Sequence, residues 1–402
     1  MRTGDTGSVI TRRFGRTELQ MPVFSCGGMR FQASWSDKGQ AIEPAEQERL
    51  EQTVLRGLEL GVTHIETARG YGTSERQLGM LLPALDRDSF ILQTKIAPDP
   101  DPDVFEEEFR ESLKRLQLDR IDLLSLHGIN TWEKFWWSAR PGGCLARARD
   151  LQAAGLVGSV GFSTHGSTEL IAAALEHDAD GGFDYVNLHW YFINQRQWPS
   201  IEVATQRDMG VFIISPSDKG GRLYDPPQEL VELCAPLDPI TFNNAWCLAH
   251  PQVHTLSLGA ARPSDFDPVA ASLEALSDPD LLVQIEGRLA DAMRQATGVA
   301  HPDELTQGLP DFEDAPGFVN LRVITWLRGL VLGWGMQEYA QGRYRMLGHA
   351  SDWFPGLDAA HVGDLDLTKA VRESPFAEQV PGWLTEADQM LGGETVHRLS
   401  AS

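Results

Sequence analysis

Eight short apolar segments alternate with amphipathic helical segments over the first two thirds of this 402-residue chain, and this alternation constrains the fold most. The segments with strand-like composition are residues 23–28, 63–68, 90–96, 121–128, 157–163, 183–190, 210–216 and 254–260. Between them, apolar residues recur at the 3.6-residue period of a helix. Such regular alternation predicts a parallel sheet, and eight units within about 260 residues favour a closed (β/α)8 TIM barrel.

Two local features agree with a barrel rather than an open sheet. No G-x-G-x-x-G turn follows residues 23–28, which disfavours an open dinucleotide-binding sheet. Residues 12–25 (RRFGRTELQMPVFS) contain two short extended runs around a glycine-containing turn. We expect these residues to form a hairpin that closes the floor of the barrel.

The alternating pattern ends near residue 276. Residues 277–298 predict a long helix, and an apolar segment follows at 318–336. Because Arg322 and Arg328 interrupt that segment, we interpret it as a helix facing a core rather than a membrane span. We therefore expect a barrel domain at 1–275 and a mainly helical C-terminal extension at 276–402.

Composition excludes several classes of partner. The net charge of −23 argues against nucleic acid and anionic membranes, since either would need a basic face. The four cysteines have no metal-ligand or disulfide spacing, and the first residues lack an apolar leader segment. We expect a cytoplasmic protein with reduced thiols and no bound metal, whose oligomeric state the sequence does not predict.

Polar residues stand where the predicted strands end, which is where barrel enzymes place their chemistry. Residues 63–68 carry Glu66 and are followed by Tyr71, residues 90–96 carry Lys95, and residues 121–128 carry His127. Because these segments would be neighbouring strands, we expect the four side chains to converge on one site.

This combination suits proton donation to a carbonyl group. Tyrosine, with a pKa near 10, is a weak acid unless a nearby cation stabilises its phenolate, and Lys95 can supply that charge. Glu66 can hold Lys95 protonated, and His127 can donate a hydrogen bond to a substrate oxygen. Taken singly, each residue also fits a structural role: an ion pair, a capped histidine or a half-buried tyrosine.

Several motifs resemble the aldo-keto reductase family. They are GVTHIETARGYGTSERQLG (61–79), ESLKRLQLDRIDLLSLHG (111–128), RDLQAAGLVGSVGFSTHGS (149–167), SLGAARPSDF (257–266) and the opening RRFGRTEL (12–19). Together these motifs span roughly residues 11–270, in the order found in the family. The resemblance implies a catalytic set of acid, tyrosine, lysine and histidine on Glu66, Tyr71, Lys95 and His127. It implies an NADPH-dependent oxidoreductase that reduces a small aldehyde or ketone to an alcohol.

The same resemblance implies the cofactor contacts. Ser163 and Asn187 would hold the nicotinamide carboxamide, and Ser215 and Gly259 would also contact the cofactor. Arg262, helped by Ser264, would meet the adenosine 2′-phosphate, which favours NADPH over NADH.

Two residues depart from the family pattern. Glu66 stands where the family normally has Asp, so one extra methylene must be accommodated for the contact with Lys95. Ile214 stands where many members have an aromatic residue that stacks on the nicotinamide.

The C-terminal region resembles the extension of a subgroup of these reductases that carries a ferredoxin-like iron–sulfur module. This chain has no cysteine after Cys247, so the thiolate ligands of such a cluster are missing. We expect a remnant without a cluster that covers the barrel mouth or forms an oligomer contact. Deleting residues after about 300 should then change substrate affinity or assembly.

Two other functions stay open at this stage. The first is a metal-dependent barrel hydrolase, because His127, His165 and His189 all stand at or just beyond predicted strand ends. The second is a catalytically weak, NADPH-binding sensor or partner subunit, which the Glu66 departure favours. Trp132, Trp136 and Trp137 could line a substrate pocket or pack a helix.

Overall fold

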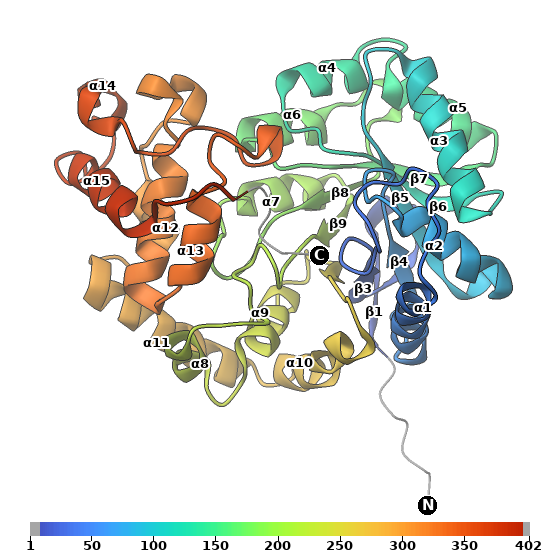
Figure 1. Cartoon of the computed structure of the whole chain (residues 1–402), viewed down its shortest axis with the longest axis horizontal. Coiled ribbons are helices and arrows are strands. Elements are labelled where there is room, and N and C mark those ends of the chain that lie inside the picture. Colours follow the sequence, from blue (N-terminus) through green and yellow to red (C-terminus); the bar gives the residue numbers. More distant parts are fainter. Residues whose placement is uncertain (1–8, 397–402) are drawn as a thin grey trace, which may run out of the picture.

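A closed barrel of eight parallel strands forms the centre of the computed structural model, which describes residues 9–396 (Figure 1). Its strands are hydrogen-bonded in the order β10-β3-β4-β5-β6-β7-β8-β9, with β10 closing onto β3. The bounds of these strands are β3 Phe24–Gly27, β4 His64–Glu66, β5 Ile91–Ile96, β6 Ile121–Leu126, β7 Val157–Ser163, β8 Tyr185–Leu188, β9 Gly210–Ile213 and β10 Thr255–Leu258. The predicted (β/α)8 barrel is confirmed.

Helices surround the barrel and continue into the C-terminal region. Those within the first 276 residues are α1 Pro44–Glu59, α2 Ser74–Leu81, α3 Pro102–Leu116, α4 Trp132–Ala139, α5 Cys144–Ala153, α6 Thr168–Glu176, α7 Trp198–Gln206, α8 Gln228–Cys234, α9 Pro239–Leu248 and α10 Pro268–Leu276. The C-terminal helices are α11 Pro279–Thr297, α12 Leu321–Trp334, α13 Gln337–Tyr344, α14 Thr368–Val371 and α15 Val380–Leu391. The mainly helical extension is therefore present.

The predicted hairpin closes one end of the barrel. Strand β1 (Thr11–Arg13) pairs antiparallel with β2 (Gln20–Pro22). Phe14, in the turn between them, is fully buried and packs on Tyr185 of β8, with ring centroids 5.6 Å apart. A fully buried aromatic ring therefore fills this end of the barrel.

Several strands are shorter than the apolar segments predict, because the backbone turns before the apolar residues end. Strand β9 ends at Ile213. Ser215 follows with a φ of 54°, which is incompatible with a strand, and the next residue is Pro216. Strand β6 ends at Leu126, so His127 follows the strand instead of ending it. The turn there passes through Gly128, whose φ is 74°.

The helix boundaries follow local signals in the sequence. Asp278 caps α11 by accepting a hydrogen bond from the backbone of Leu281, and Pro279 occupies the first helical position. The helix ends at Gly298, which adopts the left-handed conformation. Within residues 318–336, Leu321–Trp334 form α12, whose buried face includes Ile324 and Leu330, as expected for a core-facing helix. Within residues 9–396, none of the helices has the length and apolar character needed to cross a membrane.

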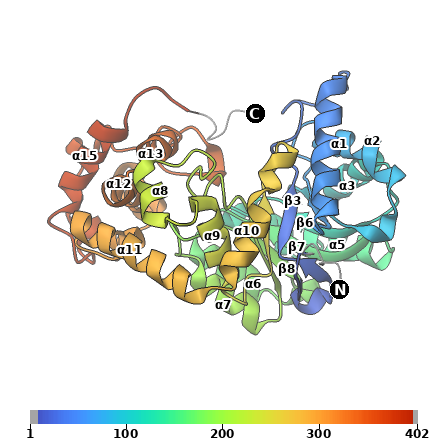
Figure 2. The same ribbon diagram turned by 90° about the horizontal axis from the view of Figure 1, so that it is seen from below.

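The C-terminal helices lie beside the barrel (Figure 2). Helix α12 contacts α11, α13 and α15, and α11 also contacts α8, which belongs to the connection between β9 and β10. Side chains of the extension bond to loops of the barrel at several points, and two of these hydrogen bonds come from α12 and α13. Trp326 donates a hydrogen bond to the carbonyl of Ile193 at 2.7 Å, and the Tyr339 hydroxyl donates to the carbonyl of Lys219. The division near residue 276 stays a proposal.

Candidate active site

Four polar side chains meet at the open end of the barrel. Glu66 ends β4, Lys95 lies near the end of β5, and His127 directly follows β6. Tyr71 lies in the loop between β4 and α2. All four line one cavity at this end, which we call the barrel cavity.

Hydrogen-bond distances join three of these side chains. The Lys95 ammonium forms an ion pair with Glu66 and donates to the carbonyl oxygen of Thr67 at 3.0 Å. Its Nζ lies 3.3 Å from the Tyr71 hydroxyl, which in turn lies 3.5 Å from Glu66 Oε1. The rings of Tyr71 and His127 meet edge to face, with centroids 5.7 Å apart. A proton donor, a cation and a neutral hydrogen-bond donor are thus grouped around one space.

The structure accommodates the longer Glu66 side chain because the facing residue is a glycine. Gly27 on β3 pairs in register with Glu66. A Cβ atom on Gly27 would lie 3.3 Å from Glu66 Oε2 and 2.4 Å from Ser257 Oγ. The Glu66 carboxylate therefore reaches Lys95 through space that any other residue at position 27 would restrict.

Burial governs the protonation states of the site. It raises the pKa of Tyr71, and it lowers the pKa of Lys95, to which the positive charge of Lys219 also contributes. Burial and the positive charges of Lys95, Lys134 and Lys219 lower the pKa of His127 to about 3. At neutral pH Tyr71 therefore carries its proton, and His127 is a neutral imidazole able to donate one hydrogen bond.

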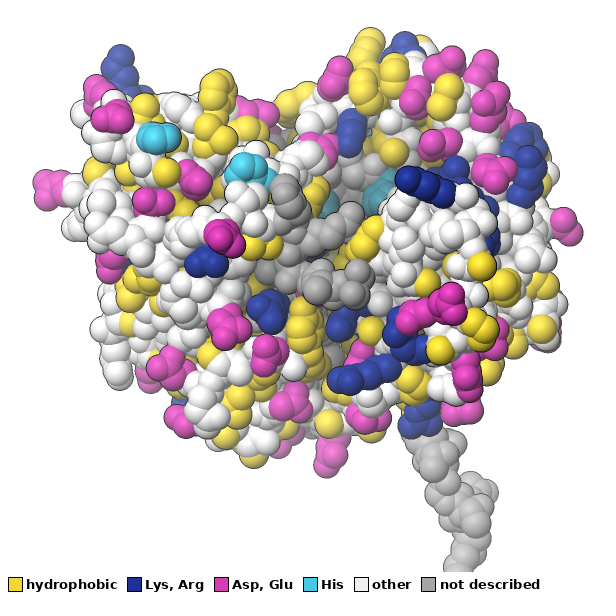
Figure 3. Space-filling model, viewed as in Figure 1, with side chains coloured by type: hydrophobic (Ala, Val, Ile, Leu, Met, Phe, Trp, Pro, Cys, Tyr) yellow, Lys and Arg dark blue, Asp and Glu magenta, His cyan; other side chains and the backbone are white. Residues whose placement is uncertain are grey.

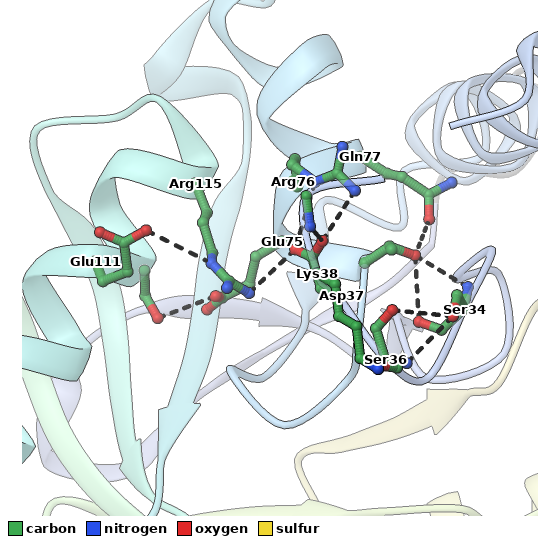
Figure 4. A network of polar contacts seen from close by, with 12 residues as sticks. Ser34, Ser36, Asp37, Lys38, Glu75, Arg76, Gln77, Glu111 and Arg115 are labelled. Carbon is green, nitrogen blue, oxygen red and sulfur yellow. Dashed lines mark hydrogen bonds and ion pairs between the residues drawn. The ribbon is translucent and has the colours of Figure 1, made fainter. Parts of the chain in front are cut away.

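The loop after β3 holds Tyr71 from the outside. Trp35 in this loop meets the Tyr71 ring edge to face at 6.5 Å. Asp37, with only 6% of its side chain exposed, anchors the loop through ion pairs to Arg76 at 2.9 Å and Arg115 at 3.3 Å (Figure 4). Because the loop is bonded to α2 and α3, the placement of Tyr71 depends on the outer helices.

The loop also approaches the backbone closely at Gly72. The φ of Gly72 is 53°, and a Cβ atom there would lie 1.9 Å from the carbonyl oxygen of Ser34. Glycine next to Tyr71 is thus required both by the backbone conformation and by the contact with the loop.

Four of the six predicted cofactor residues lie in or beside the barrel cavity. Ser163, Ser215 and Gly259 line it. Asn187 is fully buried on β8, next to Ser163 in the register of β7 and β8. Neither Asn187 Nδ2 nor Oδ1 has a hydrogen-bond partner among residues 9–396. A buried amide without partners fits a ligand that offers both a donor and an acceptor, as a carboxamide does.

The other two predicted residues lie outside the cavity. Arg262 and Ser264 are exposed on the turn that follows β10, and Arg262 forms an ion pair with Asp265 at 3.1 Å. This turn lies on the same side of the barrel as Gly259.

Sequence reasoning missed other residues of the barrel cavity. Arg30 lines it, donates to the carbonyl of Gly259 at 2.8 Å and stacks on Tyr224. Lys219 also lines it, and burial together with the charge of Arg343 lowers the pKa of Lys219 to about 7. The loop sequence Ser215–Gly221 was the available signal for Lys219, since a lysine after a barrel strand stands at the active end. Its burial depends on the C-terminal helices, which the loop sequence does not reveal.

The histidines do not converge as the metal-hydrolase alternative requires. His165 and His189 lie with their Nε2 atoms 3.4 Å apart. Within residues 9–396, no group of three or more His, Cys, Asp or Glu side chains is arranged to hold a metal ion. Of the tryptophans on α4, Trp132 and Trp136 are more than half exposed, and Trp132 lines a second pocket beside the barrel cavity.

Comparison with known proteins gives a family match over half of the chain. Residues 24–225 match the model of the aldo/keto reductase family. An uncharacterized oxidoreductase of Mycobacterium tuberculosis is 36% identical over 115 residues, which are 28% of this chain and 33% of that protein. The chain thus spans about a third of the length of the curated relatives it matches.

Solved structures share the fold at low sequence identity. An aldo-keto reductase from Klebsiella pneumoniae, in complex with NADPH, is 20% identical with a TM-score of 0.57, over 70% of this chain and 95% of that one. The holo form of an aldo-keto reductase from Bacillus halodurans is 19% identical with a TM-score of 0.57, over 70% and 96%. These structures match the barrel architecture.

Proposed function

This chain belongs to the aldo/keto reductase family, and on that premise we propose that it reduces the carbonyl group of a small aldehyde or ketone with NADPH. One observation carries the proposal. The Tyr71 hydroxyl lies 3.3 Å from Lys95 Nζ, in the cavity that Glu66 and His127 also line.

The proposed chemistry follows from the charges of these four residues. Tyr71 keeps its proton at neutral pH because burial raises its pKa, and it gives that proton to the carbonyl oxygen as the oxygen gains negative charge. The neighbouring Lys95 ammonium then stabilises the phenolate that remains. Glu66 favours the charged form of Lys95, and His127 donates a hydrogen bond to the same carbonyl oxygen.

Asn187 and Ser163 would hold the nicotinamide end of the cofactor, and Ser215 and Gly259 would line its path toward Arg262 and Ser264. The bound cofactor supplies a hydride for the carbonyl carbon. The choice of NADPH rests on Arg262, whose guanidinium is exposed, pairs with Asp265 and is suited to a phosphate. The NADPH complex of the Klebsiella pneumoniae relative supports the same choice.

Fluorescence titration with NADPH and NADH, followed by turnover measurements with aldehydes, ketones and quinones, tests the proposal. We expect tighter binding of NADPH, oxidation of NADPH with at least one substrate, and a fall in kcat of about 100-fold or more in Tyr71→Phe. A Tyr71→Phe variant as active as the wild type would refute the proposed mechanism. Cofactor binding without turnover of any substrate would favour the sensor alternative.

A further inference from the structure

A second pocket lies between the barrel and the C-terminal helices, and we call it the lateral pocket. It is bounded by the loops after β6, β7 and β8 and by residues of α12, α13 and the segment 353–355. Its volume is about 210 Å³. An apolar cavity of about 150 Å³ holds a benzene ring, so this space admits a small organic molecule. Figure 3 shows a hollow between the two halves of the molecule, with histidine side chains visible in it.

Arg343 of α13 brings an unpaired positive charge into this pocket. The residue is 8% exposed, and no acidic side chain within residues 9–396 forms an ion pair with it. Its Nε and Nη1 atoms are buried without a hydrogen-bond partner. The guanidinium stacks on the ring of Phe354, with Cζ 3.7 Å from the ring centroid. Stacking fixes the plane of the guanidinium but leaves its hydrogen-bond donors unused.

Lys219 adds a second cation on the barrel side of the pocket. Its Nζ lies 3.4 Å from His165 Nε2 and 4.8 Å from the centre of the Trp353 ring. In the described part of the chain, no carboxylate lies within ion-pairing distance of this ammonium. Asp218, the preceding residue, instead accepts a hydrogen bond from the Tyr224 hydroxyl at 2.7 Å.

The acidic residues of the pocket do not compensate these two cations. Asp311 forms an ion pair with Arg322 at 2.6 Å, and Glu313 is exposed at the rim. The chain has 57 acidic and 34 basic residues, so acids are abundant elsewhere. Burying cations without partners is costly, and a fold keeps them only where another contribution offsets that cost.

Two histidines complete the polar wall. The Tyr191 hydroxyl donates to the carbonyl of Ile214 at 2.9 Å, so its contact with His189 requires Nδ1 of His189 to be the donor. His189 Nε2 then faces His165 Nε2 at 3.4 Å. Because burial lowers the pKa of both histidines, they are neutral at pH 7 and add no further positive charge.

The lateral pocket adjoins the barrel cavity, and His165 and Lys219 belong to the walls of both. A ligand that spans both pockets would pass His165 and Lys219 between Tyr71 and Arg343. We propose that the lateral pocket binds the anionic end of the substrate, with Arg343 and Lys219 as its cationic ligands, so that the substrates are carbonyl compounds bearing a carboxylate or phosphate group. This inference rests on the proposed function for the position of the carbonyl group.

The planar guanidinium of Arg343 presents paired donors that match two oxygens of a carboxylate. Binding of an anion also satisfies Nε or Nη1, which have no partner in the protein. The C-terminal helices thereby contribute a specificity-determining residue to a site whose reacting groups all belong to the barrel.

Matched substrates test the inference through kinetics. We expect 4-formylbenzoate to be reduced with a much lower KM than its methyl ester. Arg343→Met should raise the KM for the acid about 10- to 100-fold and change the KM for the ester less than about twofold. A comparison of the KM values for glyceraldehyde 3-phosphate and glyceraldehyde tests whether the pocket recognises a phosphate as well as a carboxylate. A wild type that reduces acid and ester with equal KM, and shows no preference for the phosphate either, would overturn the inference while the proposed function stands.

Variants of neighbouring residues separate recognition from folding. Arg322→Met removes a cation from the same pocket that already has Asp311 as its partner, and we expect a change in KM below about threefold. Arg343→Lys keeps the positive charge, so its KM for the acid should lie between the values for the wild type and Arg343→Met. If Arg343→Met unfolds, Lys219→Met provides the second test and should also raise the KM of the acid selectively. Equal effects on acid and ester in Lys219→Met would count against the inference.

Calorimetric titration with 4-(hydroxymethyl)benzoate measures anion binding without turnover. We expect binding by the wild type and by Tyr71→Phe, and at least tenfold weaker binding by Arg343→Met. If no carbonyl compound is reduced, the proposed function fails. This titration alone then tests whether the lateral pocket binds an anion. Equal dissociation constants in wild type and Arg343→Met would overturn it.

Discussion

Replacing Glu66 with glutamine tests whether the ion pair with Lys95 supports both the fold and the chemistry. The side chains of Lys95 and Glu66 are 1% and 4% exposed, and the substitution leaves the ammonium without its charged partner, with only neutral acceptors such as Thr67 and Tyr71 around it. Removing one partner of a buried pair costs about 3–5 kcal/mol. We therefore expect Glu66→Gln to lower the free energy of unfolding by about that amount.

The effect should depend on pH in a definite direction. Lys95 in the unfolded chain titrates near 10.5, whereas its pKa in the folded chain is lower. Between these two values the unfolded chain binds more protons, so the free energy of unfolding rises with pH. Without the carboxylate the folded pKa falls further, so this rise should begin at a lower pH in Glu66→Gln than in the wild type.

Urea unfolding, followed by tryptophan fluorescence from pH 6 to 9.5, measures both effects, and kcat is measured on the same samples. Glu59→Gln is the matched control, because its carboxylate is 69% exposed and pairs with Arg56 at 3.4 Å. We expect the control to change stability by less than about 0.5 kcal/mol. The double variant Glu66→Gln/Lys95→Met should regain much of the lost stability but no activity.

Two outcomes would refute this reasoning. One is a Glu66→Gln variant no less stable than Glu59→Gln. The other is a double variant whose loss equals the sum of the two single losses, since residues in contact should couple.

Three further substitutions probe other parts of the molecule. Phe14→Ala should lower the free energy of unfolding by about 3–5 kcal/mol, because the ring is fully buried, while the KM for NADPH stays within twofold of the wild-type value. Gly27→Ala should lower kcat about 10- to 100-fold, because its Cβ overlaps Ser257 Oγ and crowds the Glu66 carboxylate. Adding Glu66→Asp should relieve part of the loss, and a normal kcat in Gly27→Ala would contradict the close approach. For an anionic aldehyde, kcat/KM should fall as the pH rises through about 7, where Lys219 loses its charge, and Lys219→Met should flatten the profile. An unchanged profile in that variant would show that Lys219 does not cause the pH dependence.

The barrel was predictable from sequence because its signals are local and repeated. Apolar segments and helical periods recur eight times, and helix ends carry explicit signals such as Asp278 and Gly298. Strand ends were less predictable. The apolar segments continue beyond the last hydrogen bond between neighbouring strands. The strands end where the backbone turns, as it does at Ser215 and Gly128.

The candidate site was partly predictable for the same reason. Glu66, Tyr71, Lys95 and His127 lie at or just beyond the ends of consecutive strands, so the barrel topology brings them together. Arg343 could not be assigned in this way, because it belongs to α13 and reaches the barrel only through packing of the C-terminal helices. The role of Gly27 was also hidden, since it depends on the register between β3 and β4.

The hairpin floor has a kinetic consequence. Because Phe14 packs against Tyr185 at the hairpin end, a cofactor and a carbonyl compound would both enter the barrel from the opposite end. A nicotinamide ring held by Asn187 would lie beneath the carbonyl compound, so its departure would have to await release of the alcohol. Turnover would then be ordered, with exchange of the cofactor as a natural slow step.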